Sequence, residues 1–286
     1  MCKDLCRLCI IEIKNLSVPG APGVKAGEQM DYKLVMNTAV LAGEMMLRSG
    51  AETYRVEDTM YHILRTAQTE TVEASVMMTG IVATISNPDM EPITVIKRVQ
   101  ERGTNLNRIM KVNDISRKYC AGELTLKAAY EELKNIGGKQ YRVWVYNLAT
   151  ILVPTGFAPL FGGGILETAA AAAVGCVLAL VVTLGKRLQI NGFILDTLSS
   201  LGIAAAAILL KWVFPSLDED IVIISAIMPM VPGVAITNAV RDTLQGDYIS
   251  GGARILEAFL KAATVALGVG AGMALAGLIH PGGGIL

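Results

Sequence analysis

The sequence has 286 residues, with 25 Lys and Arg against 25 Asp and Glu, so its formal net charge is zero. This balance argues against a nucleic-acid partner, which usually selects a strongly basic surface. The charges are unevenly spread, because residues 1–140 hold 35 of the 50 and residues 141–286 hold only 15. We therefore predict a charged, soluble-looking part joined to an apolar part, with a boundary near residue 140.

Residues 1–30 are predicted to form a flexible tail. Three of the five cysteines lie here, as Cys2, Cys6 and Cys9. Their spacing matches the iron–sulfur loop of radical-SAM enzymes, but that loop follows the first strand of a barrel, and no strand–helix repeat follows here. We interpret the tail as reduced and expect no cofactor. It also lacks the long apolar core of a secretory signal.

Residues 31–140 are predicted to form a small cytosolic α+β domain. Apolar residues recur at helical spacing in its first half and alternate in its middle. Neither a nucleophile–base arrangement nor a metal-ligand spacing appears, which argues against an enzyme. Glu44, Arg55 and Glu57 are expected to form an ion network between the first two helices. The expected helices cover 31–50, 52–67, 104–120 and 124–136, and the expected strands cover 71–78, 81–86 and 94–99.

Residues 141–286 are predicted to form a membrane domain of about five transmembrane helices. Each apolar window is close to the ~20 residues that a helix needs to cross ~30 Å of hydrocarbon. The windows are rich in Ala and Gly, which favour close helix packing, and Gly268-x3-Gly272 is one such pattern. The expected spans are about 143–161, 165–185, 192–213, 219–240 and 255–279.

The basic residues of this domain predict its orientation. Lys186 and Arg187 lie between the second and third windows, and Arg241, Arg254 and Lys261 lie near the junction of the fourth and fifth. Loops on the cytoplasmic side of a membrane carry an excess of Lys and Arg. We therefore expect a multi-pass protein of the plasma (inner) membrane, with the N-terminal domain in the cytoplasm and the C-terminus outside.

The fourth window contains two helix breakers, Pro229 and Pro232, followed by Gly233. Proline removes a backbone hydrogen bond, so we expect the helix to be interrupted there. A break within a membrane must be buried in protein or line a wet cavity. The bare N–H groups of the following half-helix would suit a carboxylate, and Thr237 and Asn238 could add hydrogen bonds.

A proline kink that only serves packing is the alternative interpretation. The first window also contains two prolines, Pro154 and Pro159, so we expect a second interrupted helix that faces the first. The candidate substrate-binding residues are therefore Pro154, Pro229, Pro232, Gly233, Thr237 and Asn238.

Several charged residues of the apolar part are candidates for proton transfer or gating. Asp196 lacks an obvious local partner, so it is either a proton or ammonium site or an interfacial residue at a helix start. Glu257 lies on one helical face with Arg254 and Lys261, where mutual pairing is expected. Arg241, Asp242 and Asp247 belong to the predicted cytoplasmic junction, as a gate or an ion-pair lock.

Four motifs resemble those of the threonine/serine exporter (ThrE) family, and the resemblance covers about residues 31–279. The fourth is the most specific, because it keeps the order Pro, Pro-Gly, Thr-Asn, Arg-Asp, Gly-Asp and Arg. The motifs are LAGEMMLRSGAETYRVEDTM (41–60), T-G-I-x-A-T (79–84), RGTNLNRIMKVNDISR (102–117) and MPMVPGVAITNAVRDTLQGDYISGGARILEA (228–258).

The resemblance implies a secondary exporter, driven by the proton-motive force, of threonine and serine or of a dicarboxylate such as succinate. It also implies the larger subunit of the split form of the family, which works with a separate small membrane protein. A homo-oligomer is compatible with the sequence. A membrane-anchored enzyme and a non-transporting receptor or scaffold with a ligand-sensing cytosolic domain are the alternatives.

Overall fold

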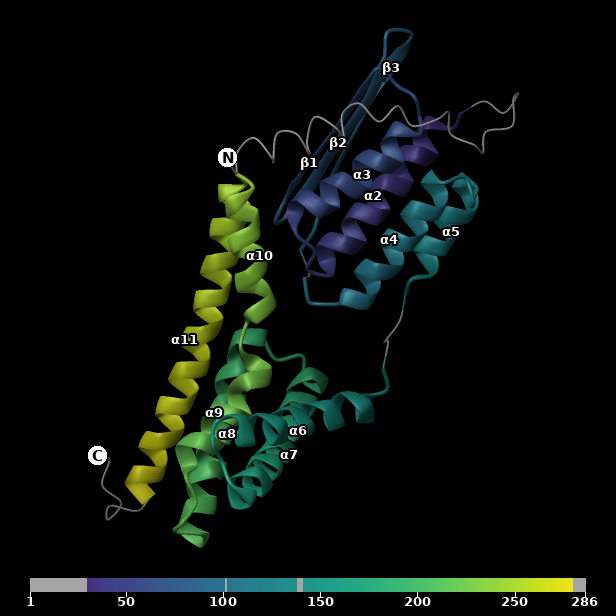
Figure 1. Cartoon of the computed structure of the whole chain (residues 1–286). Helices are drawn as coiled ribbons and strands as arrows, with labels where there is room; N and C mark the ends of the chain where they lie inside the picture. The colour runs from purple at the N-terminus through teal and green to yellow at the C-terminus, as the bar shows by residue number, and fades with distance from the viewer. Residues whose placement is uncertain (1–29, 101, 138–140, 280–286) are drawn as a thin grey trace, which may run out of the picture. The chain divides into compact units, whose positions relative to one another are not determined.

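The structure is a computed structural model that describes residues 30–100, 102–137 and 141–279 (Figure 1). Cys2, Cys6 and Cys9 lie outside the described residues, so the predictions for them stay predictions. The chain divides into two compact units. Unit 1 holds the residues up to Gly137 together with Arg241–Ser250, and unit 2 holds Gly138–Val240 together with the residues from Gly251 onward. We describe each unit by itself.

Unit 1 contains helices and a sheet in three layers, with α2 and α3 between the sheet and the pair α4 and α5 (Figure 1). Three of the helices begin at side-chain caps that satisfy a free backbone N–H group. Asp31 accepts from Leu34 N at 2.9 Å, and Asn105 and Thr125 cap α4 and α5 in the same way. The helices are α2 (Tyr32–Arg48), α3 (Thr53–Arg65), α4 (Leu106–Cys120) and α5 (Leu126–Asn135).

The sheet of unit 1 is an antiparallel meander in the order β1-β2-β3. Val76 pairs with Ile81 across the first hairpin, and Ala83 pairs with Val95 across the second. Side chains alternate between the faces of a strand, so Ile81, Ala83 and Ile85 all point to the buried face. The strands are β1 (Thr71–Met77), β2 (Gly80–Asn87) and β3 (Met90–Arg98); β3 therefore begins four residues earlier than predicted.

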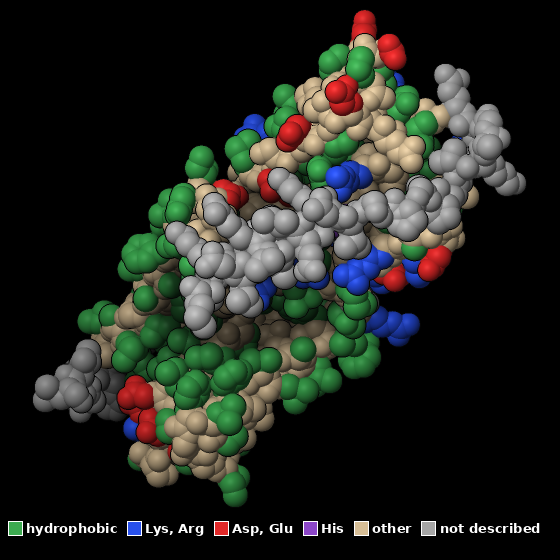
Figure 2. All heavy atoms as spheres, turned by 45° about the horizontal axis from the view of Figure 1, so that its top comes forward, with side chains coloured by type: hydrophobic (Ala, Val, Ile, Leu, Met, Phe, Trp, Pro, Cys, Tyr) green, Lys and Arg blue, Asp and Glu red, His purple; other side chains and the backbone are tan. Residues whose placement is uncertain are grey.

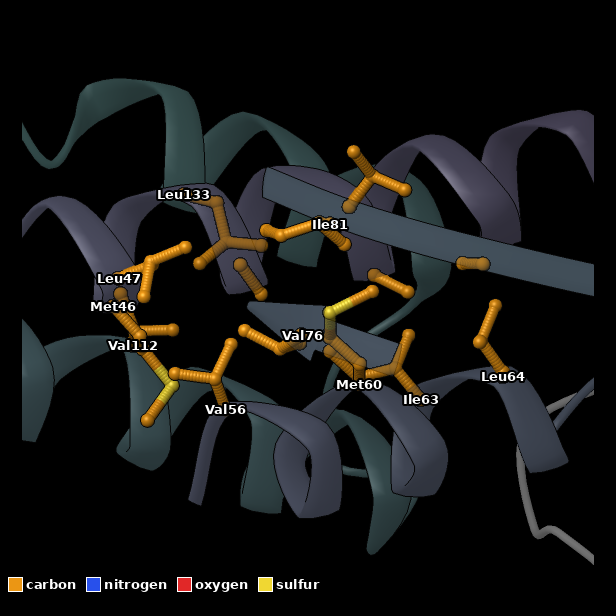
Figure 3. Packing of buried hydrophobic residues seen from close by; sticks show 14 of the residues in the cluster. Met46, Leu47, Val56, Met60, Ile63, Leu64, Val76, Ile81, Val112 and Leu133 are labelled. Atoms are coloured by element: carbon orange, nitrogen blue, oxygen red, sulfur yellow. The ribbon is translucent and has the colours of Figure 1, made fainter. Parts of the chain in front are cut away.

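The core of unit 1 lies between α2, α3 and the sheet, and α4 and α5 close it (Figure 3). Gly43 of α2 leaves room for the side chain of Met60 from α3, because a Cβ atom at Gly43 would lie 2.3 Å from the Met60 sulfur. Large apolar side chains fill the remaining space. Those labelled in Figure 3 are Met46, Leu47, Val56, Met60, Ile63, Leu64, Val76, Ile81, Val112 and Leu133.

The predicted ion network between α2 and α3 is wrong, because its three members have other partners. Arg55 Nη1 lies 3.9 Å from Glu52 Oε2. Glu44 pairs with Lys97 of β3 at 3.2 Å and with Arg48 at 3.6 Å. Glu57 accepts a hydrogen bond from Val76 N at 2.7 Å, at the end of the sheet. The sheet supplies the partners Lys97 and Val76, and the helical spacing of α2 and α3 gives no indication of either contact.

Unit 2 consists of helices, most of them long enough to cross a membrane. Four helices meet the length and composition expected for a span, and a bent pair would make a fifth. The four are α6 (Val143–Leu160), α7 (Ile165–Arg187), α8 (Gly192–Val213) and α11 (Tyr248–Ile279); the pair is α9 (Glu219–Ile227), extended by the 3-10 turn η1 (Met228–Met230), and α10 (Gly233–Leu244). The prediction of a mainly helical membrane domain is thus confirmed.

Small residues let the helices of unit 2 approach one another. A Cβ atom on Gly268 would lie 2.0 Å from Ser200 Oγ, and one on Gly272 would lie 2.9 Å from the Leu201 carbonyl oxygen. The predicted contact ridge Gly268-x3-Gly272 is confirmed, with α8 as its partner. Gly185 of α7 leaves room for Leu195 of α8, because a Cβ atom on Gly185 would lie 2.2 Å from Leu195 Cδ1.

The surface of unit 2 is rich in large apolar side chains, which Figure 2 shows as broad hydrophobic areas. Leu180 on α7 and Leu267 on α11 are 60% and 68% exposed. A soluble protein seldom exposes wide apolar patches, whereas a helix surrounded by lipid does. Together with the helix lengths, this surface indicates a multi-pass membrane protein.

One prediction about the unit 2 helices is wrong. Helix α6 is one continuous helix, although Pro154 and Pro159 lie inside it. The two prolines are five residues apart and fall in different turns, so the turn between them keeps its hydrogen bonds. Helix α11 contains the apolar window predicted at about 255–279 and begins seven residues before it, at Tyr248.

Candidate functional site

The fourth predicted span is interrupted between η1 and α10, as the sequence predicts. The bend between the two helical parts is 56°. Val231 has extended backbone angles, φ −63° and ψ 127°, which is the conformation that a following proline favours. Pro229 and Pro232 are three residues apart, so they remove two N–H donors from the same turn. The helix cannot continue through that turn.

The break leaves backbone N–H groups at the start of α10. The first helical hydrogen bond of α10 runs from Ile236 N to the Pro232 carbonyl oxygen, at 3.0 Å. The preceding N–H groups of a helix have no acceptor within it, and they form the positive end of the helix dipole. In α10 these are the groups of Val234 and Ala235, and they suit an anion such as a carboxylate.

The two polar residues one turn further along α10 differ in exposure. Thr237 is exposed, and its hydroxyl donates to the Gly233 carbonyl oxygen at 2.9 Å. Its proton is therefore used within the helix, and its oxygen remains able to accept. Asn238 is buried, at 7% exposure.

The register of α8 against α9 brings the break level with a buried serine. Lys211 of α8 forms an ion pair with Glu219, the first residue of α9. Twelve residues back from Lys211 is Ser199, and twelve residues on from Glu219 is Val231. Since the two helices run in opposite directions, both residues come to the same level, about 18 Å from the ion pair. Ser199 is 1% exposed, and its Oγ has no hydrogen-bond partner among the described residues.

An ion pair joins α8 and α11 about one turn from Ser199. Lys261 Nζ lies 3.7 Å from Asp196 Oδ2, and both side chains are partly buried. From the sequence, Asp196 has no obvious partner within its own helix, and the structure supplies one from α11. The spacing of α11 holds the missing signal, because Lys261 lies one heptad before Gly268 and so on the face that packs against α8.

A polar contact between α6 and α7 lies at a similar level. Thr183 Oγ1 donates to Asn147 Oδ1 at 3.0 Å. The contact of Gly185 with Leu195 sets the register of α7 against α8, so Thr183 comes level with Thr197. We call this group of residues the polar layer: Asn147, Thr183, Asp196, Ser199 and Lys261, with the break at Met228–Gly233.

The structure distributes the predicted site residues over three parts of the chain. The break unites Pro229, Pro232 and Gly233 with Thr237 and Asn238, and Asp196 lies in the polar layer. By contrast, Arg241, Asp242 and Asp247 belong to unit 1. Pro154 packs where α6 meets Gly175 of α7, and Arg254 and Glu257 lie on the second and third turns of α11.

Sequence reasoning missed Asn147, Thr183, Ser199 and Lys261 as members of the layer. Each looks unremarkable within its own helix, and the register between helices brings them together. Within the described residues, no group of three or more His, Cys, Asp or Glu side chains is arranged to hold a metal ion.

Comparisons with known proteins agree with this architecture. The chain matches the ThrE family, described as "Putative threonine/serine exporter", over residues 37–276. It is 22% identical over 252 residues to a "Probable threonine/serine exporter" of Mycobacterium tuberculosis. The aligned region covers 85% of this chain but only 46% of that protein. The chain thus spans about half the length of this relative.

Two shorter relatives match almost from end to end. Each is named "Probable succinate transporter subunit YjjP". The Klebsiella aerogenes protein is 24% identical, with 88% of this chain and 97% of the relative covered. The Escherichia coli protein is 26% identical, with 85% and 94% covered. No solved structure matches the chain.

The helical bundle, its apolar surface and its bent helix pair define a multi-pass membrane protein. The family match extends over more than half of the sequence. The chain therefore belongs to the threonine/serine exporter (ThrE) family.

Proposed function

We propose that this chain is a subunit of a secondary exporter for a small carboxylate-bearing metabolite, either threonine and serine or a dicarboxylate such as succinate. The observation that carries the proposal is the break at Met228–Gly233, which comes level with the buried Ser199 and with partly buried polar side chains inside an apolar bundle. Its support comes from the family, whose related proteins are named as exporters or transporter subunits.

In the proposed mechanism, the break binds the substrate carboxylate through the N–H groups at the start of α10. Asn238 and the Thr237 oxygen orient the rest of the molecule. The pair Asp196–Lys261 offers one negative and one positive group at the same level, so it can bind a substrate ammonium or a second carboxylate, or carry a proton when the pair opens. Alternating access then exposes the polar layer to one side of the membrane at a time.

The proposed setting is the plasma (inner) membrane, with the N-terminal domain (31–140) in the cytoplasm and the C-terminus outside. Lys186, Arg187 and Arg254 support this orientation by the positive-inside rule. We also propose a separate small membrane subunit as a partner. Two relatives of similar length are named as subunits, and the mycobacterial relative is about twice as long as the aligned region.

Efflux from preloaded vesicles tests the proposal. Vesicles that contain the full chain, with and without its candidate small partner, are loaded with labelled threonine, serine or succinate, and a pH gradient is imposed. We expect gradient-dependent efflux of at least one of them when both proteins are present. Failure of all three in the presence of the partner would contradict the proposal.

Two variants test the polar layer within the same assay. Asp196→Asn leaves Lys261 without its negative partner, and we expect it to lower efflux at least tenfold. The matched control is Glu219→Gln, which breaks an ion pair at the other end of α8, away from the layer. Equal losses in the two variants would mean that the layer has no special part in transport.

A further inference from the structure

Helix α3 of unit 1 begins without a cap from its own neighbourhood. Glu52, the residue at its N-cap position, makes no side-chain capping hydrogen bond. The acceptor comes instead from residue 242. Asp242 Oδ1 accepts from Thr53 N at 3.1 Å and from Thr53 Oγ1 at 2.9 Å, across a separation of 189 residues. A carboxylate at this position also meets the positive end of the α3 dipole.

The surrounding segment Arg241–Ser250, which we call the elbow, is held to unit 1 at two further points. Arg241 Nη1 lies 2.7 Å from Glu52 Oε1. Ser250 Oγ accepts from Met78 N at 3.2 Å, just beyond the end of β1. Together with the Asp242 cap, these contacts join the elbow to α3 and to the sheet.

The elbow has a fixed internal shape. Gly246 turns the chain with φ +96°, a conformation that other residues adopt only with strain. Asp247 N donates to the Asp242 carbonyl oxygen at 3.0 Å, and Asp247 Oδ1 accepts from Ser250 N at 3.1 Å. The second bond caps the first turn of α11, so α11 begins within the elbow.

Burial makes this attachment specific. Asp242 and Ser250 are both 0% exposed, and Thr53 is 2% exposed. A carboxylate removed from water is strongly destabilising unless hydrogen bonds compensate it. The buried position of Asp242 is therefore stable only while Thr53 N and Thr53 Oγ1 donate hydrogen bonds to its carboxylate.

Helix α10 joins the elbow to the break. It is a single helix of 12 residues, beginning at Gly233 in unit 2 and ending at Leu244 in unit 1. A helix of this length is about 18 Å long. Its continuous backbone links the elbow to the N–H groups beside Pro232.

We infer that unit 1 positions the substrate-binding end of α10 through the Thr53–Asp242 cap and the Glu52–Arg241 ion pair. Asp242 and Arg241 are then positioning residues for transport, which do not touch the substrate themselves. The inference rests on the proposed function for its transport consequence. The attachment itself is testable without any transport.

The test uses the full chain, with its partner for transport, and compares Asp242→Ala with Asp242→Asn. The amide keeps an oxygen acceptor for Thr53, and alanine removes it. We expect Asp242→Ala to raise hydrogen exchange at least fivefold both in residues 53–56 and in residues 233–240, and Asp242→Asn to restore most of the protection. A purely structural cap would change only the first segment.

Transport kinetics give the second readout. Asp242→Ala should raise the KM for the exported substrate at least fivefold, with a partial return in Asp242→Asn. Thr53→Val removes one donor and should have a smaller effect in the same direction, which keeps the test valid if the alanine variant does not fold. The matched control is Asp58→Asn, which breaks a pair with His62 on the exposed side of the same helix.

The outcomes separate the two proposals. Unchanged exchange in residues 233–240 in both Asp242→Ala and Thr53→Val would overturn the inference, whatever the transport result. If the unmodified protein and its partner export none of the three substrates, the proposed function fails, and the exchange data still decide whether unit 1 holds α10.

Discussion

Each unit of this chain is stabilised internally by packing, but large and small side chains have opposite places in the two units. Unit 1 buries its large apolar residues, such as Met60 and Leu64, between helices and sheet. Unit 2 keeps many large residues on its surface and brings its helices together at Gly185, Gly268 and Gly272. The surrounding medium explains the contrast. Water drives large apolar groups inward, whereas lipid does not, so close packing holds membrane helices together.

This comparison predicts that adding volume is most damaging in unit 2. Gly268→Val places new atoms against Ser200 and the Thr197 carbonyl, so α11 must separate from α8. We expect a loss of roughly 3 kcal/mol or more of unfolding free energy. The matched control is Gly270→Val, since a Cβ atom there meets no atom within 4 Å.

Denaturation of the full chain in detergent measures this effect by tryptophan fluorescence. Both tryptophans of the sequence, Trp144 and Trp212, lie in unit 2, so the signal reports that unit. Similar stabilities of the two glycine variants would show that the ridge is not a packing contact.

In unit 1 the comparison predicts that removing volume matters instead. Ile63→Val deletes one methyl group from a side chain that is 1% exposed, and about 1 kcal/mol should be lost. Ile96→Val makes the same change on β3 where the side chain is 76% exposed, and the cost should stay within about 0.5 kcal/mol. Hydrogen exchange of α3 and β2 measures both. Equal effects would mean that the described core does not stabilise unit 1.

The charged groups of unit 1 give a smaller, pH-dependent effect. Burial raises the pKa of Glu57 above its usual 4.5, and the nearby carboxylates Asp247 and Asp242 raise it further, against the lowering effect of the Val76 N–H. The folded state then binds a proton more tightly than the unfolded state. The stabilisation is full below pH 4.5 and is lost as the pH rises through the raised pKa.

Glu57→Gln should therefore flatten the fall of unit 1 stability as the pH rises above 4.5. Glutamine keeps an oxygen acceptor for Val76 N, so the hydrogen bond survives. The measurement is hydrogen exchange of β1 in the full chain across this pH range. Parallel curves for the two proteins would contradict the assignment to Glu57.

The smallest effect is expected for the pair His62–Asp58 on the surface of α3. The hydrogen bond that His62 donates to the Asp58 carboxylate raises the pKa of His62 above its usual 6.5, and the same bond lowers the pKa of Asp58. The histidine contribution is present below pH 6.5 and is lost as the pH rises through the raised pKa. Because both side chains are more than half exposed, solvent screening keeps the effect below about 0.5 kcal/mol.

A His62→Gln variant measures this contribution. Exchange rates in α3 should differ between the variant and the unmodified protein at pH 6 and agree at pH 8. Added salt should reduce the difference at pH 6, since exposed pairs are screened. A difference that grows toward pH 8 would have the wrong sign.

Local signals in the sequence predicted much of the fold. The helices and strands of unit 1 follow from apolar periodicity and from polar caps such as Asp31 and Asn105. The break in the fourth span follows from two prolines three residues apart. The same reasoning failed for α6, where Pro154 and Pro159 are five residues apart and each turn retains enough hydrogen bonds.

The contacts between distant parts of the chain were harder to predict. The pair Asp196–Lys261 depends on how α8 packs against α11, and the cap of α3 comes from a residue 189 positions away. The heptad spacing of Lys261 from Gly268 indicates the face of α11 that packs against α8, but no periodicity within one helix identifies the partner on the other helix. The sequence marks Asp242 as a charged candidate for a gate or an ion pair, but only the fold shows that its carboxylate caps the start of α3.

The distant origin of that cap limits how the protein can be divided for experiments. A recombinant fragment that stops near Gly137 would contain every strand and core helix of unit 1, yet Thr53 and Met78 would lose the oxygen atoms that Asp242 and Ser250 provide. Grafting residues 241–250 onto such a fragment through a short linker is therefore the sound way to prepare unit 1 as a soluble sample.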